Sequence, residues 1–97
     1  MLIFDNKINL IKHLSLNNEK TIGFVPTMGG LHEGHLKLII ESKKKCDITV
    51  CSIFINPTQF NNAEDFSKYP SFLDKDLKQL KETNCDIVYS PTSKDLY

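Results

Sequence analysis

Two apolar segments separated by a helical pattern constrain this fold more than any other feature of the chain. Residues 21–25 are short and rich in β-branched side chains and end at Pro26, which predicts a buried strand. Residues 48–55 are almost continuously apolar, as is typical of a strand covered on both faces of a parallel sheet. Between them, helical spacing recurs at His35, Leu38, Ile39 and Ser42. The pattern predicts a βαβ unit, and therefore an α/β fold with a parallel sheet and flanking helices.

All four glycines of the chain lie between residues 23 and 34, and two of its three histidines, His32 and His35, lie within or directly after the end of this stretch. This region forms the turn after the first strand, at the edge where open α/β sheets bind ligands. Gly29 and Gly30 allow positive φ and a close approach of a ligand to the main chain. The first amides of a helix attract anions, and His32 and His35, three residues apart, can donate to one anion. The turn therefore predicts a phosphate site.

Spacing excludes three other sites for this turn. A Walker loop needs Lys followed by Ser or Thr after its last glycine, but Gly34 is followed by His35 and Leu36. The dinucleotide fingerprint GxGxxG is absent. The zinc-protease motif HExxH places its histidines four residues apart rather than three.

Composition excludes several classes of partner. Twelve basic residues balance twelve acidic ones, so no net field would attract nucleic acid or anionic lipid. No apolar run approaches the roughly 20 residues of a membrane span, and no secretory signal begins the chain, which predicts a cytoplasmic protein. The three cysteines form no CxxC pair, which argues against a zinc knuckle or a disulfide framework.

The remaining segments extend the α/β pattern on both sides. Residues 2–4 predict a short strand, followed by a helix capped by Asp5 with Ile8, Ile11 and Leu14 facing inward. Residues 56–70 show no clear period, which predicts a long loop of the kind that often carries function. After it, a helix capped by Ser71 and a strand at 87–89 are predicted, the helix with an apolar stripe of Leu73, Leu77 and Leu80.

Three segments of the chain, in order, resemble one known family. Residues 27–35, Thr-Met-Gly-Gly-Leu-His-Glu-Gly-His, resemble the HxGH signature of HIGH-type nucleotidyltransferases in the extended form found in pantothenate synthetases. Residues 52–60, Ser-Ile-Phe-Ile-Asn-Pro-Thr-Gln-Phe, are similar to that family's SIFVNPxQF segment. Residues 64–70 resemble its acidic stretch ending in Tyr-Pro. HxGH alone is shared by many synthetases, whereas the three segments together are specific.

The resemblance implies a Rossmann-like sheet and an ATP-dependent ligase that joins pantoate to β-alanine through a pantoyl adenylate. It implies that His32 and His35 contact the phosphates, with His35 as the general acid on the leaving group. Gln59 would bind pantoate and later β-alanine, while Asn56 would support it or cap the strand. Mg²⁺ would arrive as MgATP, resting on the phosphates with few protein ligands, and the protein would be a homodimer. The implied ATP-binding residues are Met28, Gly29, Gly30, Leu31, His32, Glu33, Gly34 and His35.

The chain departs from the family chiefly by its length. Family members continue with a second half that supplies a lysine and an aspartate near ATP and a Ser-Arg segment, and nothing here matches either. Residues 1–97 are therefore expected to be a single N-terminal nucleotide-binding lobe that binds nucleotide weakly and does not turn over alone. Two alternatives stay open: a nucleotidyltransferase of the same superfamily that stops after adenylation, and a non-catalytic α/β binding module.

Overall fold

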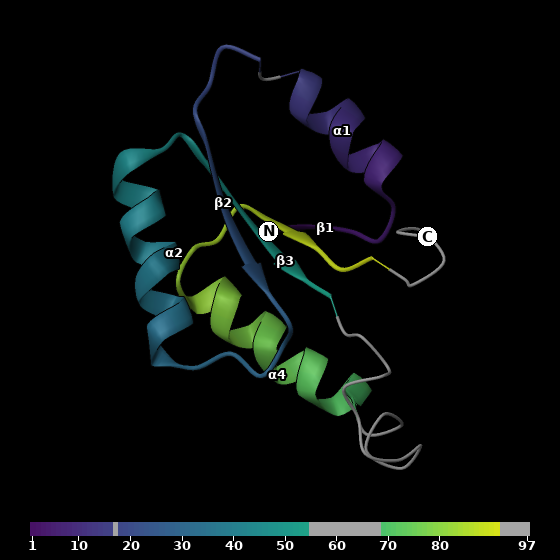
Figure 1. The fold of residues 1–97 in the computed structure, drawn as a ribbon, viewed down its shortest axis with the longest axis vertical. Coiled ribbons are helices and arrows are strands. Elements are labelled where there is room, and N and C mark those ends of the chain that lie inside the picture. The colour runs from purple at the N-terminus through teal and green to yellow at the C-terminus, as the bar shows by residue number, and fades with distance from the viewer. Residues whose placement is uncertain (17, 55–68, 92–97) are drawn as a thin grey trace.

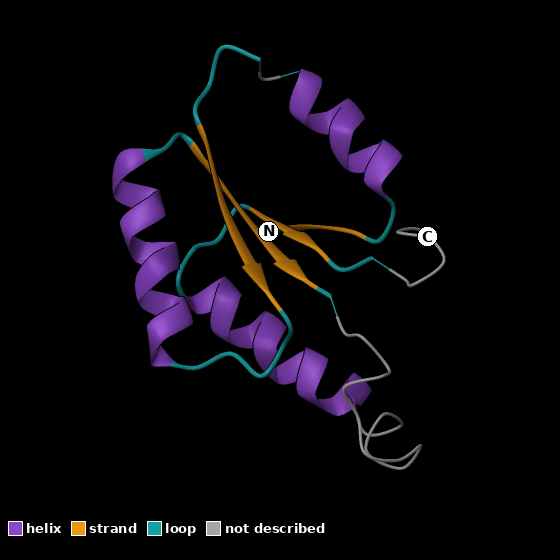
Figure 2. Ribbon diagram, viewed as in Figure 1, coloured by secondary structure: helices purple, strands orange, loops and turns teal. Residues whose placement is uncertain are grey.

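The chain forms a parallel sheet with helices on both faces (Figures 1 and 2). The computed structural model describes residues 1–16, 18–54 and 69–91. In these residues the strands follow the order β1-β4-β3-β2, and every neighbouring pair is parallel. The α/β class predicted from the sequence is confirmed. The elements are β1 (Leu2–Phe4), α1 (Lys7–Ser15), β2 (Ile22–Thr27), α2 (Glu33–Lys45), β3 (Ile48–Ile53), α4 (Tyr69–Glu82) and β4 (Ile87–Tyr89).

Strand β3 lies inside the sheet, between β2 and β4, and all of its residues are buried. Alternate side chains of a strand face opposite sides of the sheet, so β3 contributes to two cores. Cys51 and Ile53 pack with Ile39 of α2 and Leu80 of α4, while Ile48 and Val50 face α1. The continuous apolar pattern therefore correctly predicted a strand covered on both faces.

Strand β2 differs from its prediction in length and in burial. It continues through Pro26 to Thr27, and its side chains alternate between exposed and buried, whereas a buried strand ending before Pro26 was predicted. β2 lies at the edge of the described sheet, and Ile22, Phe24 and Pro26, on one of its faces, are exposed. The carbonyls of Thr21 and Thr27 point toward β3. Backbone groups of successive residues in a strand point alternately to its two sides, so those of Pro26 point to the open edge of the sheet. The N–H that proline lacks would therefore have made no hydrogen bond to β3.

Helix α1 buries a different face from the predicted one. Asn6, not Asp5, caps it, because its side-chain oxygen accepts from the amides of Ile8 and Asn9 at 2.8 and 3.2 Å. Leu10 and Leu14 pack on the sheet. Ile8 and Ile11 are exposed, so the predicted inward face was wrong at those two positions and right at Leu14.

Helix α4 carries the predicted apolar stripe but starts earlier. It begins at Tyr69 rather than after a cap at Ser71. Proline is tolerated in a first helical turn, because the N–H it lacks has no partner there, so Pro70 does not delay the start. Leu73, Leu77 and Leu80 pack against the core as predicted. None of the described helices has the length and apolarity to cross a membrane.

Candidate active site

The glycine and histidine turn lies where two parallel strands end at the same edge of the sheet. The backbone N–H of Phe54, directly after β3, donates to the carbonyl of Thr27 at 3.0 Å, at the end of β2. Phe54, the first residue after β3, therefore lies beside Thr27, the last residue of β2. This is the edge at which the βαβ pattern predicted a ligand site.

Two consecutive glycines give the turn its backbone path. Gly29 has φ 87° and Gly30 has φ 65°, both in the left-handed region that a Cβ disfavours. A Cβ on Gly30 would meet no atom within 4 Å. The backbone conformation, not crowding, is therefore what requires glycine at residue 30, and the predicted need for positive φ is confirmed.

The buried hydroxyl of Thr27 and the buried carboxylate of Asp76 form hydrogen bonds with the backbone of this turn. The hydroxyl of Thr27 donates to the carbonyl of Ser52 at 2.9 Å and accepts from the amide of Gly29 at 3.3 Å. The carboxylate of Asp76 on α4 accepts from the amides of Gly30 and Leu31 at 3.0 and 2.9 Å. Each oxygen of that carboxylate therefore has its own amide donor.

Sequence reasoning missed Asp76, although a signal was present. Asp76 follows Leu73 by three residues and precedes Leu80 by four, so it lies on the apolar face of α4. It is only 2% exposed. An unmatched acidic residue on a buried helix face must find partners, and here the partners are two amides of the turn.

The two histidines form a reciprocal cap at the start of α2. His32 is the N-cap residue, and its Nδ1 accepts from the amide of Gly34 at 3.0 Å. The amide of His32 in turn donates to Nδ1 of His35 at 3.2 Å. The ring centroids are 4.0 Å apart with the planes tilted by 40°. The structure therefore brings together the two imidazoles that the sequence predicted on one face.

These hydrogen bonds assign the position of the proton on each neutral ring. A nitrogen that accepts carries no proton, so the neutral form of both rings carries its hydrogen on Nε2. The cap uses only Nδ1 of each ring, so the Nε2–H group of each ring takes no part in it. The pair can present two such donors to one oxyanion.

The surroundings of His35 favour its neutral form. Burial lowers its pKa from 6.5, and the neighbouring His32 lowers it further, while Asp76 acts in the opposite direction. The two lowering effects prevail. At neutral pH His35 is therefore a neutral hydrogen-bond donor rather than an imidazolium.

The role expected for the backbone amides needs correction. The sequence predicted free amides at the turn and the helix start that would hold an anion. The amides of Gly30, Leu31, His32 and Gly34 instead donate to side chains of this chain. These four amides are therefore committed to bonds within the chain, whereas Nε2 of each imidazole takes no part in the cap.

The other residues of the predicted site differ in their surroundings. A Cβ on Gly34 would lie 2.9 Å from Cε1 of His32, so this glycine makes room for the capping ring. Leu31 is buried in the core and anchors the turn. Met28 is exposed, and Glu33 is exposed and lies 3.8 Å from Lys37 in a surface ion pair.

Comparison with known proteins matches residues 3–97 to the family described as pantoate-beta-alanine ligase. The chain belongs to this family. The pantothenate synthetase of Flavobacterium psychrophilum is 51% identical over 100 residues, covering 100% of this chain and 36% of that protein. That of Acinetobacter baumannii is 55% identical over 78 residues, covering 80% of this chain and 28% of that protein.

Solved structures agree with this assignment to the pantoate-beta-alanine ligase family. The ligase from Francisella tularensis, complexed with beta-gamma ATP and beta-alanine, superposes with a TM-score of 0.75 and 42% identity. The match covers 100% of this chain and 38% of the Francisella tularensis chain. Pantothenate synthetase from Thermus thermophilus gives a TM-score of 0.74 at 34% identity, over 100% of this chain and 34% of its own. The chain thus spans about a third of the length of the relatives it matches.

Two predicted substrate residues of this pantoate-beta-alanine ligase family member, Asn56 and Gln59, lie outside the described residues. Among the residues that are described, no three His, Cys, Asp or Glu side chains gather in a group that could hold a metal ion. The three cysteines carry no disulfide, and burial raises the pKa of the Cys51 thiol to about 12.

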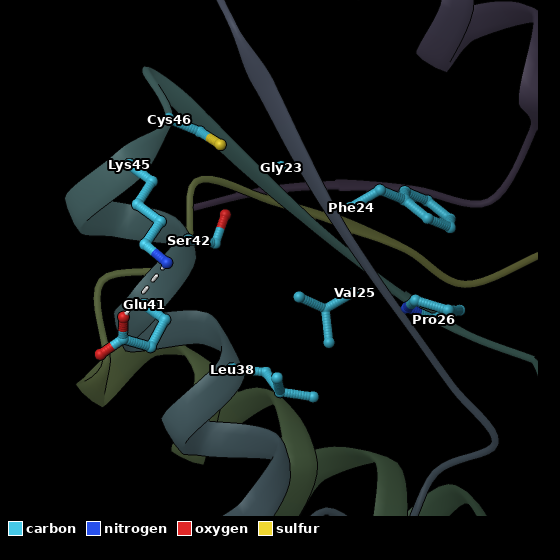
Figure 3. Close-up of a pocket in the computed structure, with 9 residues that line it drawn as sticks. All are labelled: Gly23, Phe24, Val25, Pro26, Leu38, Glu41, Ser42, Lys45 and Cys46. Carbon is cyan, nitrogen blue, oxygen red and sulfur yellow. Dashed lines mark ion pairs between the residues drawn. The ribbon is translucent and has the colours of Figure 1, made fainter.

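A separate cleft of about 430 Å³ runs between the open edge of β2 and helix α2 (Figure 3). Phe24 and Pro26 line it from the strand, and Leu38 lines it from the helix. Glu41 and Lys45 form an ion pair of 3.9 Å on its helical side. None of the predicted site residues lines this cleft.

Proposed function

We propose that residues 1–97 are the nucleotide-binding lobe of an enzyme that uses ATP to join pantoate to β-alanine. One observation carries the proposal: a reciprocal cap holds two imidazoles together at a glycine turn and leaves both Nε2 atoms as donors. Membership of the pantoate-beta-alanine ligase family supplies the substrates. The ATP and β-alanine bound by the relative from Francisella tularensis support them.

The proposed reaction has two steps and no protein nucleophile. The pantoate carboxylate attacks the α-phosphorus of ATP, pyrophosphate leaves, and a pantoyl adenylate forms. The amine of β-alanine then attacks the acyl carbon of that adenylate, and AMP leaves with pantothenate as the product. The protein need only align the reactants and stabilise charge on the phosphoryl oxygens.

His32 and His35 serve this chemistry as neutral donors. Charge that develops on phosphate oxygens in the transition state is stabilised by preorganised donors, each of which can be worth about 3 to 4 kcal/mol. The cap orients both rings before ATP arrives, so little reorganisation is needed. Because the pKa of His35 is lowered by burial, we propose that it donates a hydrogen bond from Nε2 rather than acting as a charged acid.

The remaining roles in this proposal rest on the resemblance. Met28 to Gly34 border the nucleotide, with Glu33 exposed to solvent at the rim. Gln59 and Asn56 stay predicted for pantoate and β-alanine, and Mg²⁺ would enter as MgATP. A homodimer and a cytoplasmic location also stay predictions.

The test uses the intact protein that carries residues 1–97. With ATP and pantoate alone it should release little pyrophosphate after a first turnover, and β-alanine should restore continuous release with matching AMP and pantothenate. Equal steady-state release without β-alanine would instead support the nucleotidyltransferase alternative. The purified 97-residue chain should bind ATP weakly and release no AMP, and turnover by it would contradict the proposed role as one lobe.

A further inference from the structure

We propose that Asp76 is a positioning residue that holds the glycine turn, and through it the histidine pair, in the arrangement that receives ATP. The inference rests on the proposed function for the ligand, but its structural part concerns only contacts within this chain. Asp76 does not need to touch the substrate.

The contact between Asp76 and the turn is bidentate and buried. One carboxylate oxygen accepts from the amide of Gly30 at 3.0 Å, and the other accepts from the amide of Leu31 at 2.9 Å. Two charge-assisted bonds to successive amides fix the orientation of both peptide planes. With 2% exposure, water does not compete well for the same oxygens.

The turn needs such a restraint because its own backbone is permissive. Gly29 and Gly30 have no side chains to limit their φ and ψ angles, and a Cβ at Gly30 would have open space around it. Neighbouring atoms therefore do not confine residue 30 sterically. Asp76 supplies the missing restraint from a helix that is more than forty residues away in the sequence.

The restrained peptides lead directly into the histidine pair. Leu31 precedes His32, whose amide donates to Nδ1 of His35 and whose own ring caps Gly34. A rotation of the peptide plane between Gly30 and Leu31 would move the N-cap residue and both of its hydrogen bonds. Positioning errors of about 1 Å can cost about 10²-fold in rate, so this restraint is relevant to catalysis.

The charge of Asp76 also remains available to act on the site. Among the described residues, the ion pairs join other carboxylates to lysines, and none involves Asp76. Its negative charge raises the pKa of His35, against the stronger lowering effects of burial and His32. Asp76 is therefore coupled to His35 electrostatically as well as through the turn.

The test is Asp76→Asn in the intact protein, with Asp86→Asn as the matched control. Asn keeps one acceptor but turns an NH₂ group toward the second amide, so one bond is lost with almost no change in volume. Asp86 also accepts a backbone amide, from Thr49 at 2.8 Å, and pairs with Lys43 at the other end of the strands. Both variants remove one buried or half-buried carboxylate charge, but only Asp76 contacts the turn.

We expect D76N to lower kcat/KM for ATP by about 10-fold or more, with KM for β-alanine changed by less than twofold. Asp76→Glu, which keeps the charge, should recover part of the loss. D86N should lower the melting temperature without a selective effect on ATP. If folded D76N had the ATP parameters of the wild type, or if D86N matched its loss, the positioning role would be refuted.

A second measurement separates this inference from the proposed reaction. In NMR titrations without nucleotide, D76N should lower the pKa of the His35 ring further and speed hydrogen exchange at the amides of Gly30 and Leu31. D86N should do neither. These readouts need no turnover, so they can succeed even if the protein makes no pantothenate, and unchanged values would refute the coupling even if it does.

Discussion

The backbone N–H of His32 donates to Nδ1 of His35 at 3.2 Å, so His35 completes the capping box at the start of the helix that His32 caps. A ring held in this way has one nitrogen committed to structure and one left for a ligand. The two nitrogens of His35 therefore have separable roles, and substitutions can test each of them in the intact protein.

Replacing His35 by Asn should keep the cap and remove the outward donor. The amide oxygen of Asn reaches about as far as Nδ1, whereas nothing in Asn replaces Nε2. We expect kcat to fall by about 10² to 10³-fold, as for loss of one transition-state donor, with a change in unfolding free energy below about 1 kcal/mol. Steady-state kinetics and urea denaturation measure the two effects.

The companion substitution His35→Gln reverses the pattern. The longer amide can place its NH₂ near the position of Nε2, but it no longer accepts from the amide of His32. H35Q should therefore retain more activity than H35N and lose more stability. Equal activities in the two variants would contradict a role for the Nε2 donor.

Gly34 and Gly30 should respond differently to alanine. Gly34→Ala adds a Cβ that would lie 2.9 Å from Cε1 of His32, so the capping ring must move. Alanine also favours the helix by about 1 kcal/mol, which offsets part of the strain. G34A should therefore lose ATP affinity with little loss of stability.

Gly30→Ala is the matched comparison, because its Cβ meets no atom within 4 Å and only the positive φ of 65° opposes it. It should cost about 1 to 2 kcal/mol of stability. Calorimetric titration with ATP and thermal denaturation would distinguish the two variants. A G34A protein with normal ATP affinity would show that the position of the His32 ring is unimportant.

The lowered pKa of His35 predicts a pH dependence of stability. The unfolded chain takes up a proton at His35 near the ordinary pKa of 6.5, while the folded chain resists that proton until a lower pH. The unfolded state therefore binds more protons in this window, and stability falls as pH decreases below about 6.5 until the folded pKa is passed. Protonation of Nδ1 would also break the bond from His32.

Thermal denaturation between pH 7.5 and 5 measures this effect, and comparison with H35N isolates the contribution of His35. The wild type should lose more stability than H35N as the pH decreases through this range. Parallel curves for the two proteins would show that His35 titrates alike in both states.

A partly buried hydroxyl pair beside Gly23 provides a prediction about the fold alone. The hydroxyls of Ser42 and Thr49 are 2.7 Å apart, and a Cβ on Gly23 would collide with the Ser42 hydroxyl. Gly23→Ala should therefore destabilise the protein by about 1 to 3 kcal/mol. In the background of Ser42→Ala the same change should cost markedly less, as a double-mutant cycle by urea denaturation would measure. An additive cycle would contradict the contact.

Local pattern predicted much of this structure because the responsible interactions are close in sequence. The βαβ unit, the burial of β3 and the positive φ of Gly29 follow from residue types within a few positions of one another. The pairing of His32 with His35 is also local, because a spacing of three residues places both rings on the same face of a helical turn. Family motifs in residues 27–35 identified the turn for the same reason.

Which face of α1 and which face of β2 became buried depended on the tertiary structure. Ile8 and Ile11 have helical spacing, as do Leu10 and Leu14, and the position of α1 on the sheet selected the second pair. The exposed face of β2 followed from its place at the edge of the described sheet. Local periodicity could predict neither the buried face of α1 nor the exposed face of β2, because it does not show where an element lies in the fold.

The sequence by itself determined that two imidazoles would meet at a glycine turn after a parallel strand. Only the tertiary structure decided that the carboxylate of Asp76 would hold that turn, and that the turn's amides would be occupied within the protein. The physical reason is distance along the chain. A capping bond joins residues three apart, whereas the bond from Leu31 to Asp76 exists only after α4 has packed against the sheet.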